Sequence, residues 1–203
     1  MNRRERKKEI TKEIIIDSAL ALFKEKGFQE TYMEEIAVKS DVSKGTLYNY
    51  FQDKESIVSA YFKSLINNYS NNFNEVSEEF KKNGNIEETL NSILDFINHI
   101  YQNNMEFTAI YFRYRMQTLF YTNPIENPHR SGLEGLISEI VKNAQENNQL
   151  RKDISSTILA RNFQFLHMNY FISSVYGNKD INLEASKAQI IELFINGAGA
   201  QKN

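Results

Sequence analysis

The 203-residue sequence has no cysteine, no tryptophan, only two prolines and only three histidines. Without cysteine the chain can form neither a disulfide nor a thiolate metal site, and it has no cysteine nucleophile. The three scattered histidines leave little for metal chemistry, and we find no HExxH motif, no phosphate-cradling loop and no Ser/His/Asp signature. We therefore predict a protein that is not an enzyme and that has no metal site and no cofactor.

Long apolar runs are also missing, since none approaches the about 18 residues of a membrane span. The charged N-terminus has no apolar stretch of signal-peptide type before Ile14. We therefore expect no membrane partner and a cytoplasmic location. The net charge of −2 argues against general polyanion binding, but residues 1–12 hold six basic and two acidic side chains. This basic arm is either a solvated tail or a contact with nucleic acid.

Apolar residues recur every three or four positions and no β-type alternation is sustained, so we predict an all-α fold of about nine helices. Gly27 should end the first helix. Thr31 and Glu34 have the form of a capping box for the second, and Ser43 is a good cap for the third. The helices expected after the first span residues 31–39, 43–51, 53–82, 86–103, 105–121, 131–147, 154–176 and 183–196.

The two short helices 31–39 and 43–51, joined by a tight turn, match a helix-turn-helix, whose second helix enters the DNA major groove. Asp41 lies in the turn, where it tolerates a left-handed backbone. The expected core positions are Ile36, Ala37, Val42, Leu47 and Phe51. At about 100° per residue, Gly45, Thr46, Tyr48 and Asn49 face away from that core.

An outward glycine lowers helix propensity by up to about 1 kcal/mol, which makes sense if a ligand must approach the backbone there. Tyrosine hydroxyls and Lys44 can bind phosphate, and the Asn49 amide can pair with adenine. The alternative is an exposed polar face whose tyrosines stack on a neighbouring helix. A helical wheel drawn at about 100° per residue places Tyr50 at the edge of the side that faces the core.

Residues 14–62, "IIIDSALALFKEKGFQETYMEEIAVKSDVSKGTLYNYFQDKESIVSAYF", closely resemble the DNA-binding domain of the TetR family of bacterial transcriptional regulators. The most specific stretches are "ALFKEKGF" and "EEIAVKSDVSKGTLYNYFQDKESI". The resemblance implies a DNA-binding domain at residues 1–55 and a helical ligand-binding and dimerisation domain at residues 56–203. It also implies a homodimer on a palindromic operator in double-stranded DNA.

The resemblance further implies which side chains meet DNA. It assigns Lys54 to phosphate and moves Tyr50 to the DNA side, whereas Tyr32 departs from the Ser or Thr that the family often has there. The complete set of DNA-binding candidates is Thr31, Tyr32, Ser43, Lys44, Gly45, Thr46, Tyr48, Asn49, Tyr50 and Lys54. The basic arm in this family can lie along DNA or reach the minor groove.

Two aromatic stripes in the second domain are either core or the lining of a ligand cavity. Polar groups among them would be costly to bury without partners, and a cavity for an apolar or aromatic effector could supply such partners. The ligand-binding candidates are Phe107, Tyr111, Tyr114, Arg115, Phe163, His167 and Tyr170.

The last two helices resemble the pair that forms the family's dimer interface. The interface candidates are Ile158, Phe165, Ile172, Ile190, Ile191 and Phe194, which could equally face their own subunit's core.

The resemblance therefore implies a ligand-responsive regulator, in the first place a repressor, that releases DNA when its effector binds. The alternative is a helical adaptor that uses the same N-terminal domain, residues 1–55, to bind a protein partner. We call this domain the head. Salt separates the two hypotheses, because DNA binding weakens steeply with salt concentration.

Overall fold

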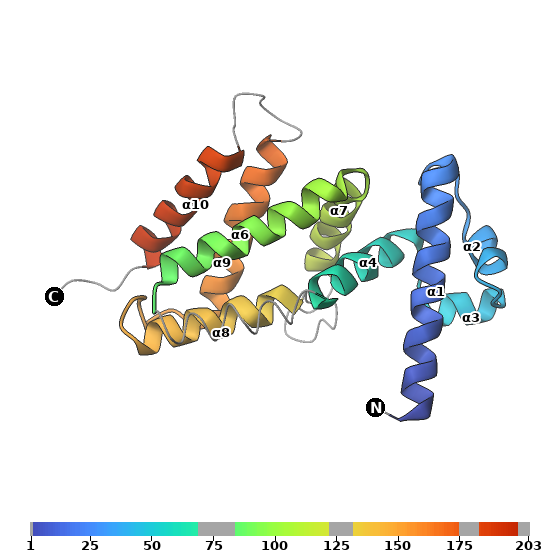
Figure 1. Cartoon of the computed structure of the whole chain (residues 1–203), viewed down its shortest axis with the longest axis horizontal. Helices are drawn as coiled ribbons and strands as arrows, with labels where there is room; N and C mark the ends of the chain where they lie inside the picture. Colours follow the sequence, from blue (N-terminus) through green and yellow to red (C-terminus); the bar gives the residue numbers. More distant parts are fainter. Residues whose placement is uncertain (1, 69–83, 122–131, 175–182, 199–203) are drawn as a thin grey trace. The chain divides into compact units, whose positions relative to one another are not determined.

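The computed structural model describes residues 2–68, 84–121, 132–174 and 183–198. In these residues it has nine α-helices and no β-strand (Figure 1), which confirms the all-α prediction. The helices are α1 (Arg3–Lys26), α2 (Met33–Lys39), α3 (Lys44–Tyr50), α4 (Lys54–Asn68), α6 (Ile86–Asn103), α7 (Met105–Tyr121), α8 (Gly132–Glu146), α9 (Ser156–Ile172) and α10 (Leu183–Ala198).

Most helix ends agree with the prediction. Both ends of α6 and α7 are as expected, and Gly27 ends α1 with a φ of 92°. α9 begins two residues later than predicted, because the Ser155 hydroxyl accepts a hydrogen bond from the Ile158 N–H at 3.4 Å and so caps the helix. The predicted continuation of the fourth helix over residues 69–82, and residues 175–176, lie outside the described residues.

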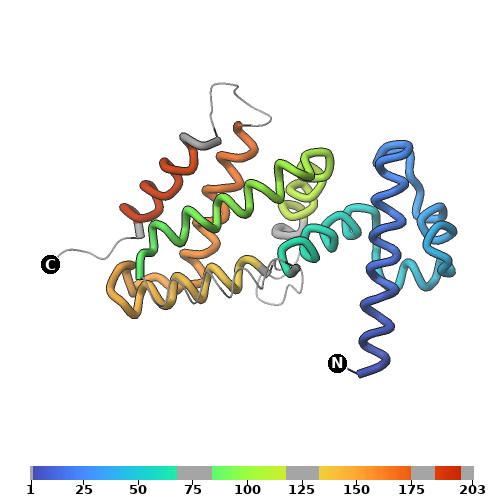
Figure 2. The backbone as a smooth tube through the Cα atoms, viewed as in Figure 1, coloured from blue at the N-terminus to red at the C-terminus, as the bar shows by residue number. Residues whose placement is uncertain are grey.

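The basic arm, residues 1–12, is the first clear difference from the sequence-based expectation of a tail or arm, since it is helical from Arg3 and forms the beginning of α1. Asn2 Oδ1 accepts a hydrogen bond from the Glu5 N–H, and Glu5 Oε2 accepts one from the Asn2 N–H, both at 2.9 Å. This capping box stabilises the start of the helix. Because the buried residues of α1 begin at Ile15, about 18 Å of helix at 1.5 Å per residue precede them. Figure 2 shows α1 as a continuous tube that reaches past α2 and α3 towards the N-terminus.

The start of α2 is the second difference. The Thr31 hydroxyl donates a hydrogen bond to the Gly27 carbonyl at 2.8 Å, so it does not cap α2. Instead Tyr32 is the cap residue, and its N–H donates to Glu35 Oε2 at 2.8 Å. The predicted Thr31–Glu34 capping box is therefore wrong by one residue, because Thr31 already has a partner in the preceding loop.

The helix-turn-helix itself forms as predicted. Asp41 has the left-handed φ of 52° that the tight turn requires. Four of the expected core residues are at most 4% exposed, namely Ile36, Ala37, Leu47 and Phe51. The buried face of α1 consists of Ile15, Ile16, Ala19 and Phe23. α2 packs against both α1 and α3, and the face of α3 opposite its buried Leu47 is open.

Tertiary contacts divide the chain into two compact units, Met1–Leu65 with Asn104–Asn127, and Ile66–Asn103 with Pro128–Asn203. α7 thus belongs to the same unit as the helix-turn-helix. The Phe107 ring lies 6.0 Å from that of Phe23 and 6.4 Å from that of Tyr61, and the Tyr61 hydroxyl donates a hydrogen bond to Asn104 Oδ1 at 2.7 Å. The functional division at residues 55 and 56 remains a prediction.

The second unit is a bundle in which α9 packs against α8 and α10, and α10 packs against α6. α6 is strongly amphipathic, and its buried face contains Leu90, Ile93, Leu94 and Ile97. The Glu134 carboxylate on α8 is almost buried and accepts a hydrogen bond from Arg161 Nε on α9 at 2.8 Å. A buried charge needs such a partner, so this pair fixes how α8 and α9 meet.

Candidate nucleic-acid interface

α3 presents an open face opposite its buried Leu47. Gly45, Tyr48 and Asn49 are exposed, and Tyr48 is 49% exposed, whereas Leu47 is fully buried. Thr46 and Tyr50 are half-buried, so Tyr50 lies at the margin between the core and the open face. The helical wheel was therefore correct for Gly45, Tyr48 and Asn49, whereas Thr46 is only half-exposed.

The backbone of α3 is accessible at Gly45. A Cβ atom added there would meet only Ser43 Oγ, at 4.0 Å, and Gly45 has no left-handed φ. The fold of this chain therefore gives no reason for a glycine at this position. A glycine on an open helical face is instead suited to the close approach of another molecule.

The start of α3 is capped as predicted. Ser43 Oγ accepts a hydrogen bond from the Thr46 N–H at 3.0 Å, and the Ser43 and Thr46 hydroxyls lie 2.8 Å apart. These contacts stabilise the first turn and keep both hydroxyl groups at the N-terminal end of α3. Ser43 is exposed and Thr46 is half-buried.

Lys44 is exposed beside an acidic residue of α2. Its ammonium group lies 2.8 Å from Glu34 Oε1. The hydrogen bond from Lys44 lowers the pKa of Glu34, and the same bond raises the pKa of Lys44. Both side chains are exposed, so a phosphate can compete with Glu34 for Lys44.

Lys54 is half-buried at the start of α4 and already has partners within the head. Its Nζ donates hydrogen bonds to the carbonyls of Phe28, at 2.6 Å, and Gln29, at 3.1 Å. It also lies 4.6 Å from the centre of the Phe28 ring. Lys54 therefore holds α4 against the loop between α1 and α2, a structural role that the sequence did not reveal.

The two candidates at the start of α2 differ sharply. Tyr32 is 62% exposed and available to a partner, but Thr31 is fully buried. Because the Thr31 hydroxyl is bonded to the Gly27 carbonyl, its predicted contact with DNA does not fit this geometry. Thr31 instead fixes the loop that positions Tyr32.

The predicted ligand-binding residues are divided between the two compact units. On α7, Phe107 and Tyr111 are buried, and the Tyr111 ring stacks on that of Phe62 at 4.4 Å. Burial raises the pKa of Tyr111. Tyr114 and Arg115 are half-buried. Phe107 and Tyr111 thus contribute to the core of the first unit, which is one of the two roles considered for them.

In the second unit, Phe163 and His167 are buried on α9 and Tyr170 is half-buried. The His167 Nε2 atom lies 2.7 Å from Asn98 Oδ1 on α6, so Nε2 carries the hydrogen of this bond. Burial lowers the pKa of His167 to about 4, which keeps the ring neutral at pH 7. The His167 ring also stacks on that of Tyr101, with the ring centres 5.8 Å apart.

The predicted dimer-interface residues fall into two groups. Ile158 and Phe165 on α9 are 50% and 43% exposed, and Ile172 is half-buried. In contrast Ile190, Ile191 and Phe194 are at most 3% exposed and belong to the core of their own subunit. Leu193 is 53% exposed and was missed, because on a helical wheel it lies only about 60° from the buried Ile190.

Two other classes of site are absent from the described residues. No group of three or more His, Asp or Glu side chains is placed to hold a metal ion in this part of the chain. No helix in the same residues is long and apolar enough to cross a membrane.

The family model "Bacterial regulatory proteins, tetR family" matches residues 15–61, which contain the helix-turn-helix. The Transposon Tn10 TetC protein of Escherichia coli is 25% identical over 191 residues, which cover 91% of this chain and 88% of TetC. The biofilm operon icaADBC negative transcriptional regulator IcaR of Staphylococcus aureus is 34% identical over 86 residues, or 42% of this chain and 45% of IcaR.

Among solved structures, the repressor FadR of Thermus thermophilus, in complex with lauroyl-CoA, superposes with a TM-score of 0.67 at 23% sequence identity. The superposition covers 95% of this chain and 97% of FadR, so the likeness extends over both compact units. At this identity the comparison establishes the fold. The match over residues 15–61 identifies the helix-turn-helix of this chain as one of the type found in bacterial regulatory proteins of the TetR family.

Proposed function

We propose that this protein is a transcriptional regulator of the TetR family, a repressor that binds a palindromic operator as a homodimer and releases it when an apolar small molecule binds. It performs no catalysis. The observation that carries the DNA-binding part is the open face of α3, where Gly45, Tyr48 and Asn49 are exposed on a capped helix anchored by Leu47.

The exposed side chains divide into two proposed roles. Tyr32, Lys44 and Tyr48 bind phosphate oxygens and so position the head on DNA. These contacts do not distinguish one base sequence from another. Asn49 reads a base edge, since its amide can pair with adenine in the major groove. Two of the three Lys54 ammonium hydrogens bond loop carbonyls and hold the head together, which leaves the third to donate to a phosphate oxygen.

The test of these roles starts from operators selected out of a random DNA pool by the wild-type protein. We expect Tyr48→Phe to weaken binding to all selected sequences alike. Asn49→Ala should instead relax the preference at one base pair of each half-site, with a discrimination loss of about 1–3 kcal/mol. A uniform loss for Asn49→Ala would remove this residue from base reading.

The helical form of the basic arm changes its proposed contact. A helix is about 10–12 Å across, whereas the minor groove is about 6 Å wide, so the arm does not enter the minor groove. Its exposed cations, among them Arg4 and Lys8, instead add sequence-independent contacts with phosphates. A variant lacking residues 2–9 should bind every selected operator more weakly and with a shallower salt dependence.

Dimerisation is proposed to use the exposed apolar side chains of α9 and α10. Ile158, Phe165 and Leu193 are each at least 43% exposed on helices that otherwise pack within the second unit. Burying such side chains drives association. The dimer would then present two α3 helices to half-sites about 34–36 Å apart, or a multiple of that spacing.

The effector is proposed to be apolar, with a long acyl chain as the first class to test. The similar FadR structure contains lauroyl-CoA, and the helices of both units here are rich in buried aromatic residues. An effector can release DNA only by binding more tightly to the form with low operator affinity. Operator binding should therefore be titrated with lauroyl-CoA, free laurate and an aromatic amine. No change with any of them would exclude these three classes.

The second candidate, a protein-binding adaptor, uses the same exposed α3 face. Binding to selected DNA over a range of salt concentrations separates it from a DNA-binding regulator. If several phosphates are contacted, the logarithm of the affinity falls linearly with the logarithm of salt, with a slope of about −0.9 per phosphate. Failure to select any DNA sequence would favour the adaptor.

A further inference from the structure

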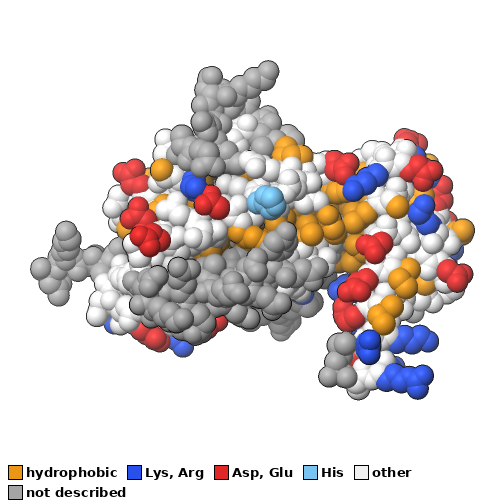
Figure 3. All heavy atoms as spheres, viewed as in Figure 1, with side chains coloured by type: hydrophobic (Ala, Val, Ile, Leu, Met, Phe, Trp, Pro, Cys, Tyr) orange, Lys and Arg blue, Asp and Glu red, His pale blue; other side chains and the backbone are white. Residues whose placement is uncertain are grey.

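Three exposed apolar side chains of the head have no role in the proposed contacts with DNA or in the proposed dimer. They are Ile10 and Ile14 on α1, which are 47% and 46% exposed, and Val38 on α2, which is 82% exposed. Single exposed apolar residues are common, but three in one small head call for a common explanation. Figure 3 shows hydrophobic side chains over the N-terminal half of α1, with Lys and Arg side chains beyond them towards the N-terminus.

The two isoleucines belong to a stripe that runs along much of α1. At about 100° per residue, Lys7, Ile10, Ile14, Leu22 and Glu25 fall within a sector of about 120°. The stripe begins with a cation and ends with a carboxylate. An antiparallel copy would therefore place Lys7 opposite Glu25 and Ile10 opposite Leu22 in a single register, and the same two pairs would form twice.

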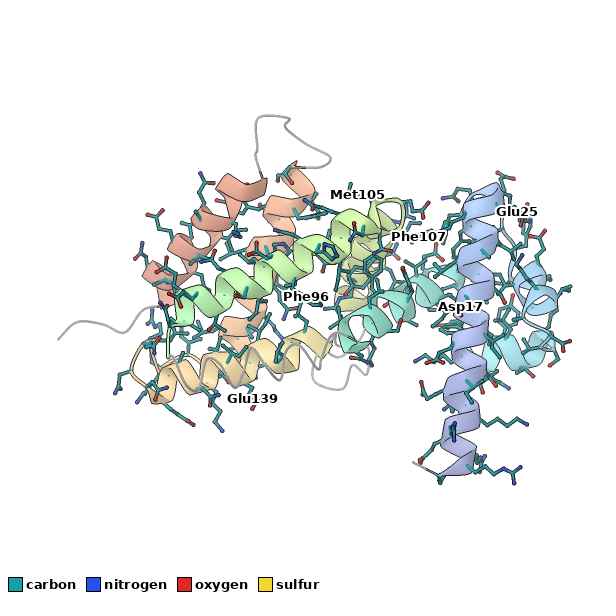
Figure 4. All side chains as sticks on the ribbon, viewed as in Figure 1. Asp17, Glu25, Phe96, Met105, Phe107 and Glu139 are labelled. Atoms are coloured by element: carbon teal, nitrogen blue, oxygen red, sulfur yellow. The ribbon has the colours of Figure 1, made fainter. Side chains whose placement is uncertain are left out.

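A hollow beside the acidic end of the stripe has room for the opposing side chain. It measures about 460 Å³ and is lined by Leu22, Glu25, Glu34, Glu35, Val38 and Lys39. The hollow thus combines two apolar side chains with three carboxylates and one ammonium group. Glu25, labelled in Figure 4, lies towards the C-terminal end of α1. Its ion pair with Lys39 is long, at 3.9 Å, and its side chain is 70% exposed.

We propose that the head binds a second copy of this chain through an antiparallel contact between two α1 helices. Ile10 of each copy enters the hollow between Leu22 and Val38 of the other, and Lys7 of each copy lies near Glu25 of the other. The contact is isologous, since the same surface serves both copies and closes around a two-fold axis. Opposite charges at the two ends of the stripe set the antiparallel direction.

The α1 contact would make DNA binding by neighbouring dimers cooperative, and this role rests on the proposed function. The two heads of one dimer occupy separate half-sites, so the α1 contact joins heads of two neighbouring dimers. A surface this small is weak on its own. DNA that carries two operators raises the effective concentration of the two dimers, and the contact then makes their binding cooperative.

The absence of cysteine allows a sharp test of the register. We would make Ile10→Cys/Leu22→Cys and treat the full-length protein with a short bismaleimide. The two positions are about 18 Å apart along one helix, so they cannot be linked within a chain. The expected result is a covalent two-chain product on a denaturing gel and assemblies larger than two chains under native conditions.

The matched control is Ile10→Cys alone, because the antiparallel register keeps the two Ile10 positions far apart. Equal cross-linking of this single variant would overturn the proposed register. Lys7→Glu in the double-cysteine background should lower the yield by about two- to fivefold, the range expected for exposed ion pairs. Adding Glu25→Lys should restore the yield, and no restoration would contradict the proposed pairing.

Other outcomes identify other occupants or separate the two proposals. If no cross-link forms with or without selected operator DNA while Asn49→Ala still relaxes base preference, the α1 contact is wrong and the proposed function stands. If cross-linking succeeds but no operator can be selected, the proposed function fails and the contact remains. Ile10-dependent sedimentation with phosphatidylserine vesicles, without cross-linking, would mean that a lipid surface covers the stripe and that the inference is wrong.

Discussion

At Gly45, a single substitution should change the stability of the fold and the affinity for DNA in opposite directions. Because a Cβ would meet only Ser43 Oγ at 4.0 Å, Gly45→Ala should raise the free energy of unfolding by up to about 1 kcal/mol. The same methyl group would lie where we propose that DNA approaches α3. We expect operator affinity to fall at least about tenfold, as measured by fluorescence anisotropy.

Gly135 provides a matched control for this substitution, since it is an exposed helical glycine of α8 where an added Cβ would meet no atom within 4 Å. Gly135→Ala should stabilise the fold by a similar amount and leave operator affinity unchanged. A Gly45→Ala protein that binds DNA as well as the wild type would contradict the close approach.

His167 makes the free energy of unfolding depend on pH. Its pKa is about 4 in the folded chain and 6.5 as an ordinary value, so the unfolded chain binds more protons between these two pH values. Stability should therefore fall as the pH is lowered from 6.5 to 4, by up to about 3 kcal/mol. Urea unfolding at several pH values measures this loss.

The comparison for that measurement is His167→Gln, whose amide can still donate to Asn98 but does not titrate. We expect this variant to lack most of the loss, whereas His99→Gln, at an exposed position, should retain it. Glu34 and Glu35, whose pKa values are lowered by their lysine partners, add a loss at lower pH that all variants share. Equal pH dependence in wild type and His167→Gln would rule out His167 as the source.

At the scale of elements, local sequence predicted the helices well where one residue alone could cap them. Ser43 caps α3, and Asn85 Oδ1 accepts hydrogen bonds from the Glu87 and Glu88 N–H groups at the start of α6. The start of α2 was missed because Glu34 and Glu35 offer two equivalent registers, and the choice depends on the Thr31 bond to Gly27. The helical arm could have been found, since Asn2 and Glu5 have capping-box spacing.

The compact unit to which α7 belongs could not be predicted from sequence. Its aromatic periodicity indicates a buried face, but a stripe does not identify its partner. In the structure that face meets Phe23, Tyr61 and Phe62 of the head unit. Phe107 and Tyr111, which we predicted as ligand-binding residues, are therefore part of the core of the first unit.

The contact between α7 and the head can be weakened in two steps. Tyr61→Phe removes the 2.7 Å hydrogen bond to Asn104 and should lower the free energy of unfolding by about 1 kcal/mol. Phe107→Ala leaves a cavity between the rings of Phe23 and Tyr61 and should lower it by about 3–5 kcal/mol. Urea unfolding measures both. Tyr48→Phe, at an exposed position, should have no effect, and a neutral Phe107→Ala would contradict the packing.

At the scale of the whole molecule, the sequence predicted the open face of α3 but did not separate buried from exposed apolar residues in the second unit. The reason is that Ile190, Ile191, Leu193 and Phe194 are all apolar, so composition does not distinguish them. Only their exposure does, and it leaves Leu193 outside and Phe194 against Phe163 with ring centres 5.1 Å apart.

The last prediction concerns this exposed apolar surface. In Phe165→Glu/Leu193→Glu the introduced carboxylates would lose their hydration in the proposed dimer interface, whereas each monomer would still fold because both positions are exposed. Sedimentation velocity should then report one chain instead of two. Operator affinity should fall by about a hundredfold or more, because each head would bind its half-site alone.

The control is Ala188→Glu, which adds a charge at an exposed position of α10 on a different side from Leu193. It should keep the two-chain mass and the operator affinity of the wild type. If Phe165→Glu/Leu193→Glu still sediments as two chains, the dimer uses another surface. A single-chain protein with unchanged operator affinity would instead mean that one head suffices for recognition, because a palindromic operator read by two heads must lose affinity when they are uncoupled.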